Sequence, residues 1–148
     1  MKLLDAIQSD RKKGKKVVFT NGCFDILHEG HIHCLTLAKS FGDVLIIGLN
    51  TDDSVSRLKG PSRPIKNERT RALLLESLKM VDYVVPFSED TPFNLIERIK
   101  PDVLVKGGDY KIEDIVGAEL VQSYGGEVKI VSYLEGNSSS NLIDKLKN

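Results

Sequence analysis

The sequence is poor in the residues that mark several protein classes. It has no tryptophan, only two cysteines among 148 residues, and 21 basic side chains against 21 acidic ones. A secreted domain held by disulfides would use more cysteines, so we expect Cys23 and Cys34 to be reduced. The neutral net charge argues against a general nucleic-acid or membrane-surface binder, because such proteins are normally basic.

Long hydrophobic runs are also absent. No stretch approaches the roughly 20 apolar residues of a membrane span. Residues 1–16 are amphipathic and then charged, unlike a signal peptide. We therefore expect a cytoplasmic protein with no membrane partner and no nucleic-acid partner. A chain of this length buries about 68–70% of its unfolded surface, so we expect a single domain over residues 1–148.

Short β-rich runs alternate with helical patterns along the chain. The runs cover residues 16–21, 43–49, 82–87, 102–107 and 127–133. Three of them contain unbroken apolar segments (VVF, VLII and VLV), which are typical of parallel strands buried on both faces. Helices are expected over residues 2–12, 28–42, 67–80, 91–100, 112–126 and 138–147. The alternation predicts an α/β fold built on a doubly wound, five-stranded parallel sheet.

Polar segments follow four of the five predicted strands. These segments read NGCFD at residues 21–25, NTDD at 50–53, KGGDY at 106–110 and GNSSSN at 136–141. In a doubly wound sheet, ligands bind beyond the carboxyl ends of the strands, where the strand order reverses. Loops are polar in general, but a Lys-Gly-Gly-Asp cluster directly after an apolar strand favours one shared polar site.

A basic block occupies residues 59–71, which contain five basic side chains and only one acidic side chain. The block contains Lys59, Arg63, Lys66, Glu68, Arg69 and Arg71. On charge alone, a solvated loop would explain the block equally well. However, basic side chains at the start of a helix oppose the helix dipole, and a phosphorylated ligand would compensate. The neighbouring Gly60, Pro61 and Pro64 fit a mobile lid that carries these charges.

The common phosphate-binding motifs are missing. The chain has no Gly-x-x-x-x-Gly-Lys-Ser/Thr motif, which excludes a P-loop enzyme. It has no Gly-x-Gly-x-x-Gly after the first strand either, which argues against a dinucleotide-dependent dehydrogenase.

Two histidines, His28 and His31, follow the first strand with a His-x-x-His spacing. This spacing can bind zinc, but no second Cys/His pair lies elsewhere in the chain, so zinc is the weaker alternative. In the other interpretation, the two imidazoles and the backbone N–H groups at a helix start hold phosphate oxygens. Gly30 between them lets the backbone come close to a ligand, and His33 is expected to point away.

The segment GCFDILHEGH at residues 22–31 resembles the signature of the nucleotidyltransferases whose hallmark is His-x-Gly-His. The Ser138-Ser139-Ser140 run resembles the second motif of that family, a Ser-Thr-rich helix start, although the chain keeps the hydroxyls and lacks the methyls. Four further segments are most similar to the adenylyltransferase of ADP-heptose synthesis, which acts on D-glycero-β-D-manno-heptose 1-phosphate. They read RLKGPSRP, VKGGDY, IVGAELVQSYGGEVKIV and SSSNLI. In many bacteria that activity is the C-terminal half of a bifunctional kinase–adenylyltransferase.

The resemblance implies a Rossmann-like fold and a definite reaction. A sugar 1-phosphate would attack the α-phosphorus of ATP and release pyrophosphate, giving ADP-heptose for lipopolysaccharide core or surface-glycan synthesis. A phosphate monoester is mostly dianionic at neutral pH, since its second pKa is about 6, so no general base is required. Mg²⁺ is expected on the ATP phosphates, held by phosphate and water oxygens rather than by protein ligands. Members are often dimeric, so a homodimer is a further expectation.

The resemblance also implies roles for individual residues. The expected catalytic residues are His28, His31 and Lys59. The expected nucleotide-binding residues are Gly22, Cys23, Phe24, His28, Gly30, His31, Lys106, Gly107, Asp109, Ser138, Ser139 and Ser140. The expected residues for the sugar phosphate are Asp25, Asn50, Asp52, Arg63 and Arg71.

Other functions remain open at this stage. The same fold and reaction could use CTP with glycerol 3-phosphate, or ATP with flavin mononucleotide. A non-catalytic nucleotide-binding domain would bind its ligand without releasing pyrophosphate, although the intact His28, Gly30 and His31 argue against a decayed site. A zinc module would contain bound metal when purified.

Overall fold

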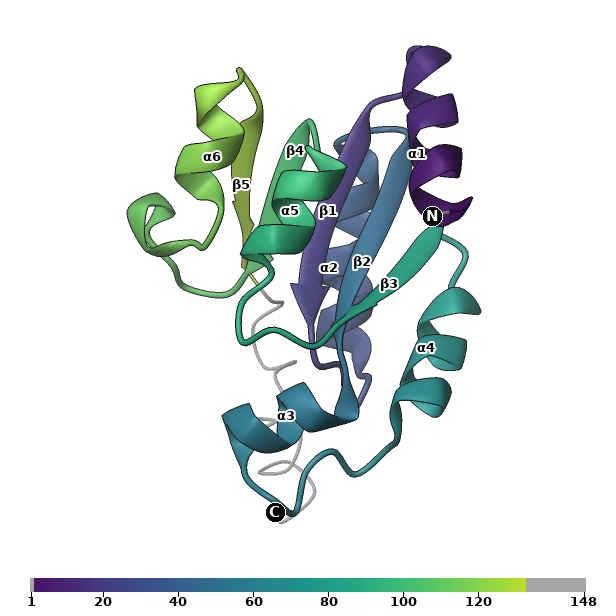
Figure 1. Cartoon of the computed structure of the whole chain (residues 1–148), viewed down its shortest axis with the longest axis vertical. Coiled ribbons are helices and arrows are strands. Elements are labelled where there is room, and N and C mark those ends of the chain that lie inside the picture. The colour runs from purple at the N-terminus through teal and green to yellow at the C-terminus, as the bar shows by residue number, and fades with distance from the viewer. Residues whose placement is uncertain (1, 133–148) are drawn as a thin grey trace.

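The structure, a computed structural model, describes residues 2–132. One five-stranded sheet lies between two layers of helices, and all of its strand pairs are parallel (Figure 1). The strands are β1 (Val17–Gly22), β2 (Val44–Asn50), β3 (Tyr83–Phe87), β4 (Val103–Gly107) and β5 (Glu127–Val131). They lie side by side in the order β3-β2-β1-β4-β5, which confirms the predicted doubly wound parallel sheet.

The helices divide between the two faces of the sheet. They are α1 (Lys2–Lys12), α2 (Glu29–Ser40), α3 (Asp52–Lys59), α4 (Glu68–Glu76), α5 (Phe93–Ile99) and α6 (Ala118–Ser123), with a short 3₁₀ helix η1 (Ile112–Asp114). Helices α1, α5 and α6 contribute to one hydrophobic cluster, and α2 and α4 contribute to the other. Figure 1 shows α5 in front of the sheet and α2 behind it. Within residues 2–132, no helix has the length and apolar character needed to cross a membrane.

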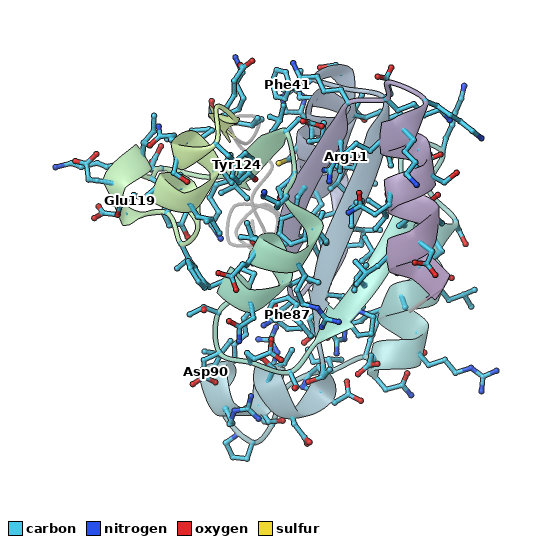
Figure 2. All side chains as sticks on the ribbon, turned by 45° about the horizontal axis from the view of Figure 1, so that its top comes forward. Arg11, Phe41, Phe87, Asp90, Glu119 and Tyr124 are labelled. Atoms are coloured by element: carbon cyan, nitrogen blue, oxygen red, sulfur yellow. The ribbon has the colours of Figure 1, made fainter. Side chains whose placement is uncertain are left out.

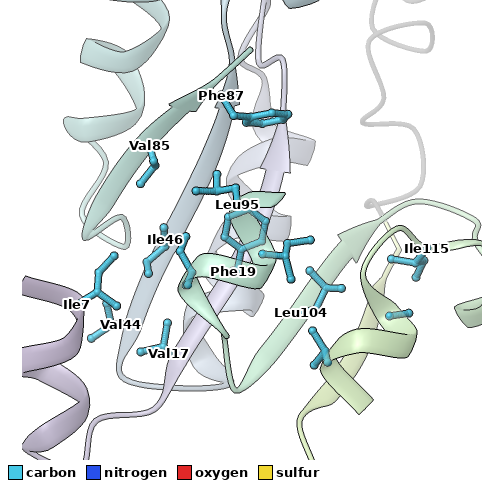
Figure 3. Packing of buried hydrophobic residues seen from close by; sticks show 14 residues of the cluster. Ile7, Val17, Phe19, Val44, Ile46, Val85, Phe87, Leu95, Leu104 and Ile115 are labelled. Carbon is cyan, nitrogen blue, oxygen red and sulfur yellow. The ribbon is translucent and has the colours of Figure 1, made fainter. Parts of the chain in front are cut away.

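The central strands are buried on both faces, which explains their unbroken apolar runs. Every residue of β2 is buried. Along β1, Val18 packs into the cluster with α2, whereas Phe19 packs into the cluster with α5. Figure 3 shows Phe19 beside Leu95 of α5. A Cβ atom at Gly48 would lie 2.7 Å from Cζ of Phe19, so β2 needs a glycine where this ring crosses it.

The predicted N-terminal helix forms and is fixed by two long-range contacts. The hydroxyl of Tyr83 donates a hydrogen bond of 2.9 Å to Asp10. The guanidinium of Arg11 donates to the carbonyl oxygens of Ile99 and Lys100 at the end of α5. Figure 2 shows Arg11 far from Phe87, which ends β3. These contacts hold the C-terminal turn of α1 near the start of β3, whereas Leu3 and Leu4 near its N-terminus line a cavity with Phe87 at the end of β3.

Helix α3 is absent from the helices expected from the sequence. It begins at the N-cap Thr51, whose hydroxyl accepts a hydrogen bond from the Ser54 N–H, and ends at Gly60 with φ +104°. Acidic residues fill its first turn and basic residues its last, an arrangement that favours the helix dipole. Lys59 is thus the last residue of a helix, and only residues 60–67 connect α3 to α4.

The prediction of one helix over residues 112–126 is wrong. The structure has the short η1, a turn, and α6. Gly117 between them has φ +87°, a backbone conformation that breaks a helix. A Cβ atom at Gly117 would also lie 2.8 Å from Cδ1 of Ile96, so a side chain there would collide with α5. The helix expected over residues 138–147 lies outside the described residues.

Candidate active site

A cleft of about 470 Å³ opens beyond the carboxyl ends of β1 and β4. These two strands are neighbours in the sheet but not in the chain, so the cleft lies where the strand order reverses. Its wall comes from the end of β1 and the loop after it, the first turn of α2, the end of α3, the connection to α4, and the end of β4. The lining residues are Asn21, Gly22, Cys23, Phe24, Asp25, Ile26, His31, Lys59, Arg63, Lys106, Gly107 and Tyr110.

Much of the predicted site comes together here. Nine predicted site residues line the cleft: Gly22, Cys23, Phe24, Asp25, His31, Lys59, Arg63, Lys106 and Gly107. Three of them, Lys59, Arg63 and Lys106, are cations that come from three different segments of the chain. An anionic ligand in this cleft would therefore meet positive charge from several sides.

The two motif histidines cap helix α2. His28 is the N-cap residue, and its Nδ1 accepts a hydrogen bond of 3.0 Å from the Gly30 N–H. The His28 N–H in turn donates to Nδ1 of His31 over 3.2 Å. This reciprocal pattern is a capping box, and it explains why the histidines are three residues apart. Since each Nδ1 accepts a hydrogen bond, each neutral imidazole carries its proton on Nε2.

Both imidazoles are held neutral. Burial lowers the pKa of His31 to about 4, and repulsion from His28 and Lys59 adds to the effect. Burial also lowers the pKa of His28, against an opposing attraction from Glu29. At neutral pH the pair therefore offers N–H hydrogen-bond donors rather than positive charge, and the cations of the cleft supply the charge.

Phe24 packs against the catalytic candidate His31. The two ring centroids are 5.3 Å apart in an edge-on arrangement, and Phe24 has φ +48°. A Cβ atom at Gly22 would lie 2.9 Å from Cε2 of Phe24. The glycine therefore leaves room for the ring, and the tight turn after β1 buttresses the imidazole.

Asp25 holds the α3–α4 connection against the loop after β1. Its buried carboxylate accepts hydrogen bonds from Nε of Arg63 at 2.8 Å and from the N–H groups of Ile65 and Lys66. Burial alone would raise the pKa of Asp25, but the hydrogen bonds from Lys66, Ile65 and Arg63 outweigh it and lower the pKa to about 2. The ion pair fixes Arg63 at the wall of the cleft.

Arg71 is fully buried and does not line the cleft. Its guanidinium donates hydrogen bonds to the carbonyl oxygens of Lys66, Cys23 and Asn50 and to the carboxylate of Asp52, all between 2.7 and 2.9 Å. The amide of Asn50 donates to the hydroxyl of Ser54. Arg71, Asn50 and Asp52 are absent from the lining of the cleft. Their contacts join the ends of β1 and β2 to the starts of α3 and α4, and the substrate contacts expected of them stay predictions.

The remaining predicted residues lie beside the cleft or beyond the described chain. His28 and Gly30 lie at the start of α2, and the ring centroids of His28 and His31 are 3.9 Å apart. Asp109 is exposed and follows Gly108, which has φ +113°. Ser138, Ser139 and Ser140 lie outside the described residues.

Two smaller cavities adjoin the cleft, and they contain residues that the sequence analysis missed. The first, of about 50 Å³, is lined by Thr20, Asn21, Phe24, His31, Cys34, Leu35, Lys106 and Gly107. The second, which we call the side pocket, has about 130 Å³ and is lined by Asn21, Pro92, Lys106, Tyr110, Asp114, Ile115 and Val116. Asn21 and Lys106 line all three spaces. Asn21 could have been found from its place at the end of the first strand, and Tyr110 from its place beside Lys-Gly-Gly-Asp.

The site offers few ligands for a metal ion. Within residues 2–132, no group of three or more His, Cys, Asp or Glu side chains is arranged to hold one. The carboxylate of Asp25, which lines the cleft, already accepts three backbone or side-chain donors. The described part of the site therefore has no ligand set for zinc and no carboxylate cage for Mg²⁺.

The sequence is similar to a known family and to longer proteins. A family model described as cytidylyltransferase-like matches residues 19–143. Two curated relatives, both named bifunctional protein HldE, come from Geobacter metallireducens and Sulfurimonas denitrificans. They are 56% identical over 144 residues and 58% identical over 137 residues. The alignments cover 97% and 93% of this chain but only 29% and 28% of those relatives, so the chain spans less than a third of their length.

Solved structures share the fold. The lipopolysaccharide core biosynthesis protein from Thermoplasma volcanium is 35% identical and superposes with a TM-score of 0.64, covering 81% of this chain and 97% of that one. Pantoate-β-alanine ligase from Francisella tularensis, in complex with β,γ-ATP and β-alanine, has a TM-score of 0.61 over 95% of this chain and 70% of its own. At 19% identity, the second likeness supports a shared fold alone.

Proposed function

The chain belongs to the cytidylyltransferase-like family, and on that premise we propose that it is an adenylyltransferase that makes ADP-heptose. It would transfer AMP from ATP to heptose 1-phosphate and release pyrophosphate. The observation that carries the proposal is the capping pair His28–His31 beside a cleft that also holds Lys59, Arg63 and Lys106. The identity to HldE and the segments shared with the adenylyltransferase of ADP-heptose synthesis support heptose 1-phosphate as the acceptor.

The reaction forms one bond to phosphorus and breaks another. An oxygen of the sugar phosphate attacks the α-phosphorus of ATP, and the bond from that phosphorus to the oxygen bridging the β-phosphorus breaks. The pair of electrons leaves with pyrophosphate. Because the attacking phosphate is already mostly dianionic, the protein has to supply alignment and charge stabilisation rather than a base.

Each group at the cleft has a role in this proposal. His28 and His31 donate Nε2–H hydrogen bonds to phosphate oxygens at the reacting centre. Neutral donors suit this task, because they stabilise developing charge without a proton transfer. Lys59 and Arg63, from one side of the cleft, and Lys106, from the end of β4, neutralise the phosphates.

The other predicted residues take supporting roles. Gly22, Cys23, Phe24, Gly30 and Gly107 would let the nucleotide approach the backbone after β1 and β4, with Asp109 near its ribose. Ser138, Ser139 and Ser140 would add hydroxyl and N–H donors to the phosphates. Asp25 would act on the acceptor through Arg63, which it positions. Asn50, Asp52 and Arg71 would hold the floor of the site.

Mg²⁺ is expected to enter with the nucleotide. Since the described residues offer no carboxylate cage, phosphate and water oxygens would hold the ion. Bound there, it would neutralise part of the triphosphate charge. A single domain, a homodimer and a cytoplasmic location also remain predictions.

The second candidate is a cytidylyltransferase that uses CTP and glycerol 3-phosphate, which the description of the matching family model favours. A pyrophosphate-release assay that crosses ATP and CTP with heptose 1-phosphate and glycerol 3-phosphate separates the two. We expect turnover with ATP and heptose 1-phosphate. Turnover only with another pair of substrates would support the proposed reaction type but contradict the proposed substrates. Nucleotide binding without any turnover would favour a non-catalytic domain.

A further inference from the structure

We propose that the side pocket binds the sugar ring of the acceptor, and that Asp114 recognises the sugar by accepting hydrogen bonds from its hydroxyl groups. This inference rests on the function proposed above, because it concerns where the second substrate lies. It assigns the acceptor to the opposite face of the sheet from the histidine pair.

The position of the side pocket supports this division of the site. Ile115, in its wall, belongs to the hydrophobic cluster on the face of α5 and α6. Cys34 and Leu35, which line the small cavity next to His31, belong to the cluster on the face of α2. The two recesses are thus on opposite faces of the sheet. They meet over the ends of β1 and β4, where Asn21 and Lys106 line both.

The charges along this path suit a sugar phosphate. Lys106 lies where the side pocket joins the main cleft, and its Nζ is 5.0 Å from the centre of the Tyr110 ring. A phosphate at this junction would pair with Lys106 and face the main cleft, where the α-phosphorus of ATP is expected. Asp114 lines the side pocket only. Its negative charge would repel a phosphate there and would favour neutral hydroxyl groups.

The walls of the side pocket suit a sugar in other ways. Tyr110, Ile115 and Val116 offer aromatic and apolar surface to the C–H groups of a ring, while Asn21 offers an amide that can both donate and accept. Within residues 2–132, no side chain or backbone group donates a hydrogen bond to the Asp114 carboxylate or pairs with it.

The size of the side pocket also fits. A single buried water needs roughly 10–15 Å³ of such space. The side pocket, at about 130 Å³, therefore has room for a compact hydroxylated ring. The main cleft, at about 470 Å³, would hold the larger nucleotide and, at the junction, the phosphate of the acceptor, with Arg63 in its wall.

The test compares Asp114→Ala with a matched control, Glu113→Ala. Both acids are exposed neighbours in η1, but only Asp114 lines the side pocket. We expect Asp114→Ala to raise the KM for heptose 1-phosphate about tenfold, because the variant loses one hydrogen bond to a charged group. The KM for ATP should stay within about twofold, and Glu113→Ala should match the wild type in both constants.

A second variant, Val116→Phe, tests the pocket by filling it. It should also raise the KM for the sugar phosphate, while the Kd for a non-hydrolysable ATP analogue stays that of the wild type. The proposal is overturned if both variants leave the acceptor KM unchanged, or if they raise the KM for ATP instead, which would place the nucleotide in the side pocket.

The wild-type assay keeps the two proposals apart. A wild-type protein with no turnover of ATP and heptose 1-phosphate contradicts the proposed function, and the inference falls with it. A wild-type protein that turns over these substrates, with unchanged Asp114→Ala and Val116→Phe variants, contradicts the inference alone.

Discussion

Asp25 and Arg63 form an ion pair of 2.8 Å that joins the loop after β1 to the connection between α3 and α4. His31 and Lys59 both lie between the two partners in the chain, His31 on the side of Asp25 and Lys59 on the side of Arg63. Asp25 is almost fully buried, whereas Arg63 is partly exposed at the wall of the cleft. The geometry of the cleft therefore depends on a carboxylate that is saturated by the protein itself.

The first prediction concerns the pH dependence of stability. The pKa of Asp25 is about 2 in the folded chain, below the ordinary value of 3.8, so its charged form stabilises the fold. That stabilisation, about 2 kcal/mol by linkage, is complete above pH ~4 and is lost as the pH falls through about 2. Urea unfolding of the wild type and Asp25→Asn should therefore differ at pH 6 and converge toward pH 2. A difference that does not change with pH would contradict the pKa shift.

His31→Ala should lower kcat by about 10²–10³-fold, the effect of removing one preorganised donor. His33→Ala is the matched control, because His33 lies on the same helix and does not line the cleft. Thermal unfolding should show that both variants fold. Equal turnover of His31→Ala and the wild type would remove this histidine from the mechanism.

The ionisation of His31 can be followed directly. Its pKa of about 4 lies below the ordinary 6.5, so the ring should stay neutral until the pH falls well below 6. Because the folded-state pKa is depressed, protonation of His31 opposes folding, and its contribution to stability falls as the pH drops below 6.5. An NMR titration of the imidazole C–H signals checks this. A midpoint for His31 near 6.5 would show that the ring is not held neutral by its surroundings.

Lys59→Ala should raise the activation barrier by about 2–4 kcal/mol, as for loss of one preorganised charge donor. Arg57→Ala is the control from the same helix, because Arg57 pairs with Asp90 and does not line the cleft. Steady-state kinetics with ATP and heptose 1-phosphate measure both. A loss in kcat/KM of less than about threefold for Lys59→Ala would contradict a role over the phosphates.

Arg71→Lys distinguishes a structural role from substrate binding. Lysine cannot reproduce four hydrogen bonds from a planar guanidinium, so the carbonyl groups of Cys23, Asn50 and Lys66 would lose donors. We expect the free energy of unfolding to fall by about 2–4 kcal/mol. A variant as stable as the wild type but inactive would instead place Arg71 in contact with substrate.

The sheet could be predicted from sequence because its central strands are buried on both faces. That environment selects unbroken apolar runs, and the runs at Val17, Val44 and Val103 begin the three inner strands. Helix α3 was missed because its signals are polar: a Thr51 cap, two acids in the first turn and basic residues in the last. The helix predicted over residues 112–126 was too long, because a single glycine can be tolerated inside a helix. The sequence does not show that Gly117 has a positive φ or that a side chain there would collide with Ile96.

The sequence predicted which residues lie near the candidate site better than it predicted what each of them contacts. Strand-end position and the His-x-Gly-His motif identified residues that the fold gathers around one cleft, such as Gly22, His31 and Lys106. They could not show that Arg71 turns inward, because its partners at Cys23 and Asn50 are 48 and 21 positions away in the chain. A basic block in a sequence does not distinguish cations that face a ligand from cations that hold the backbone.

The central claim is that the cleft transfers a nucleotidyl group from ATP to a sugar phosphate. The most direct measurement incubates the protein with Mg²⁺, heptose 1-phosphate and ATP that is radiolabelled at either the α- or the γ-phosphorus, and separates the products. The account predicts that the α label enters a nucleotide sugar and that the γ label leaves as pyrophosphate. An α label that stays in ATP or ADP, or a γ label that moves to the sugar, would contradict it.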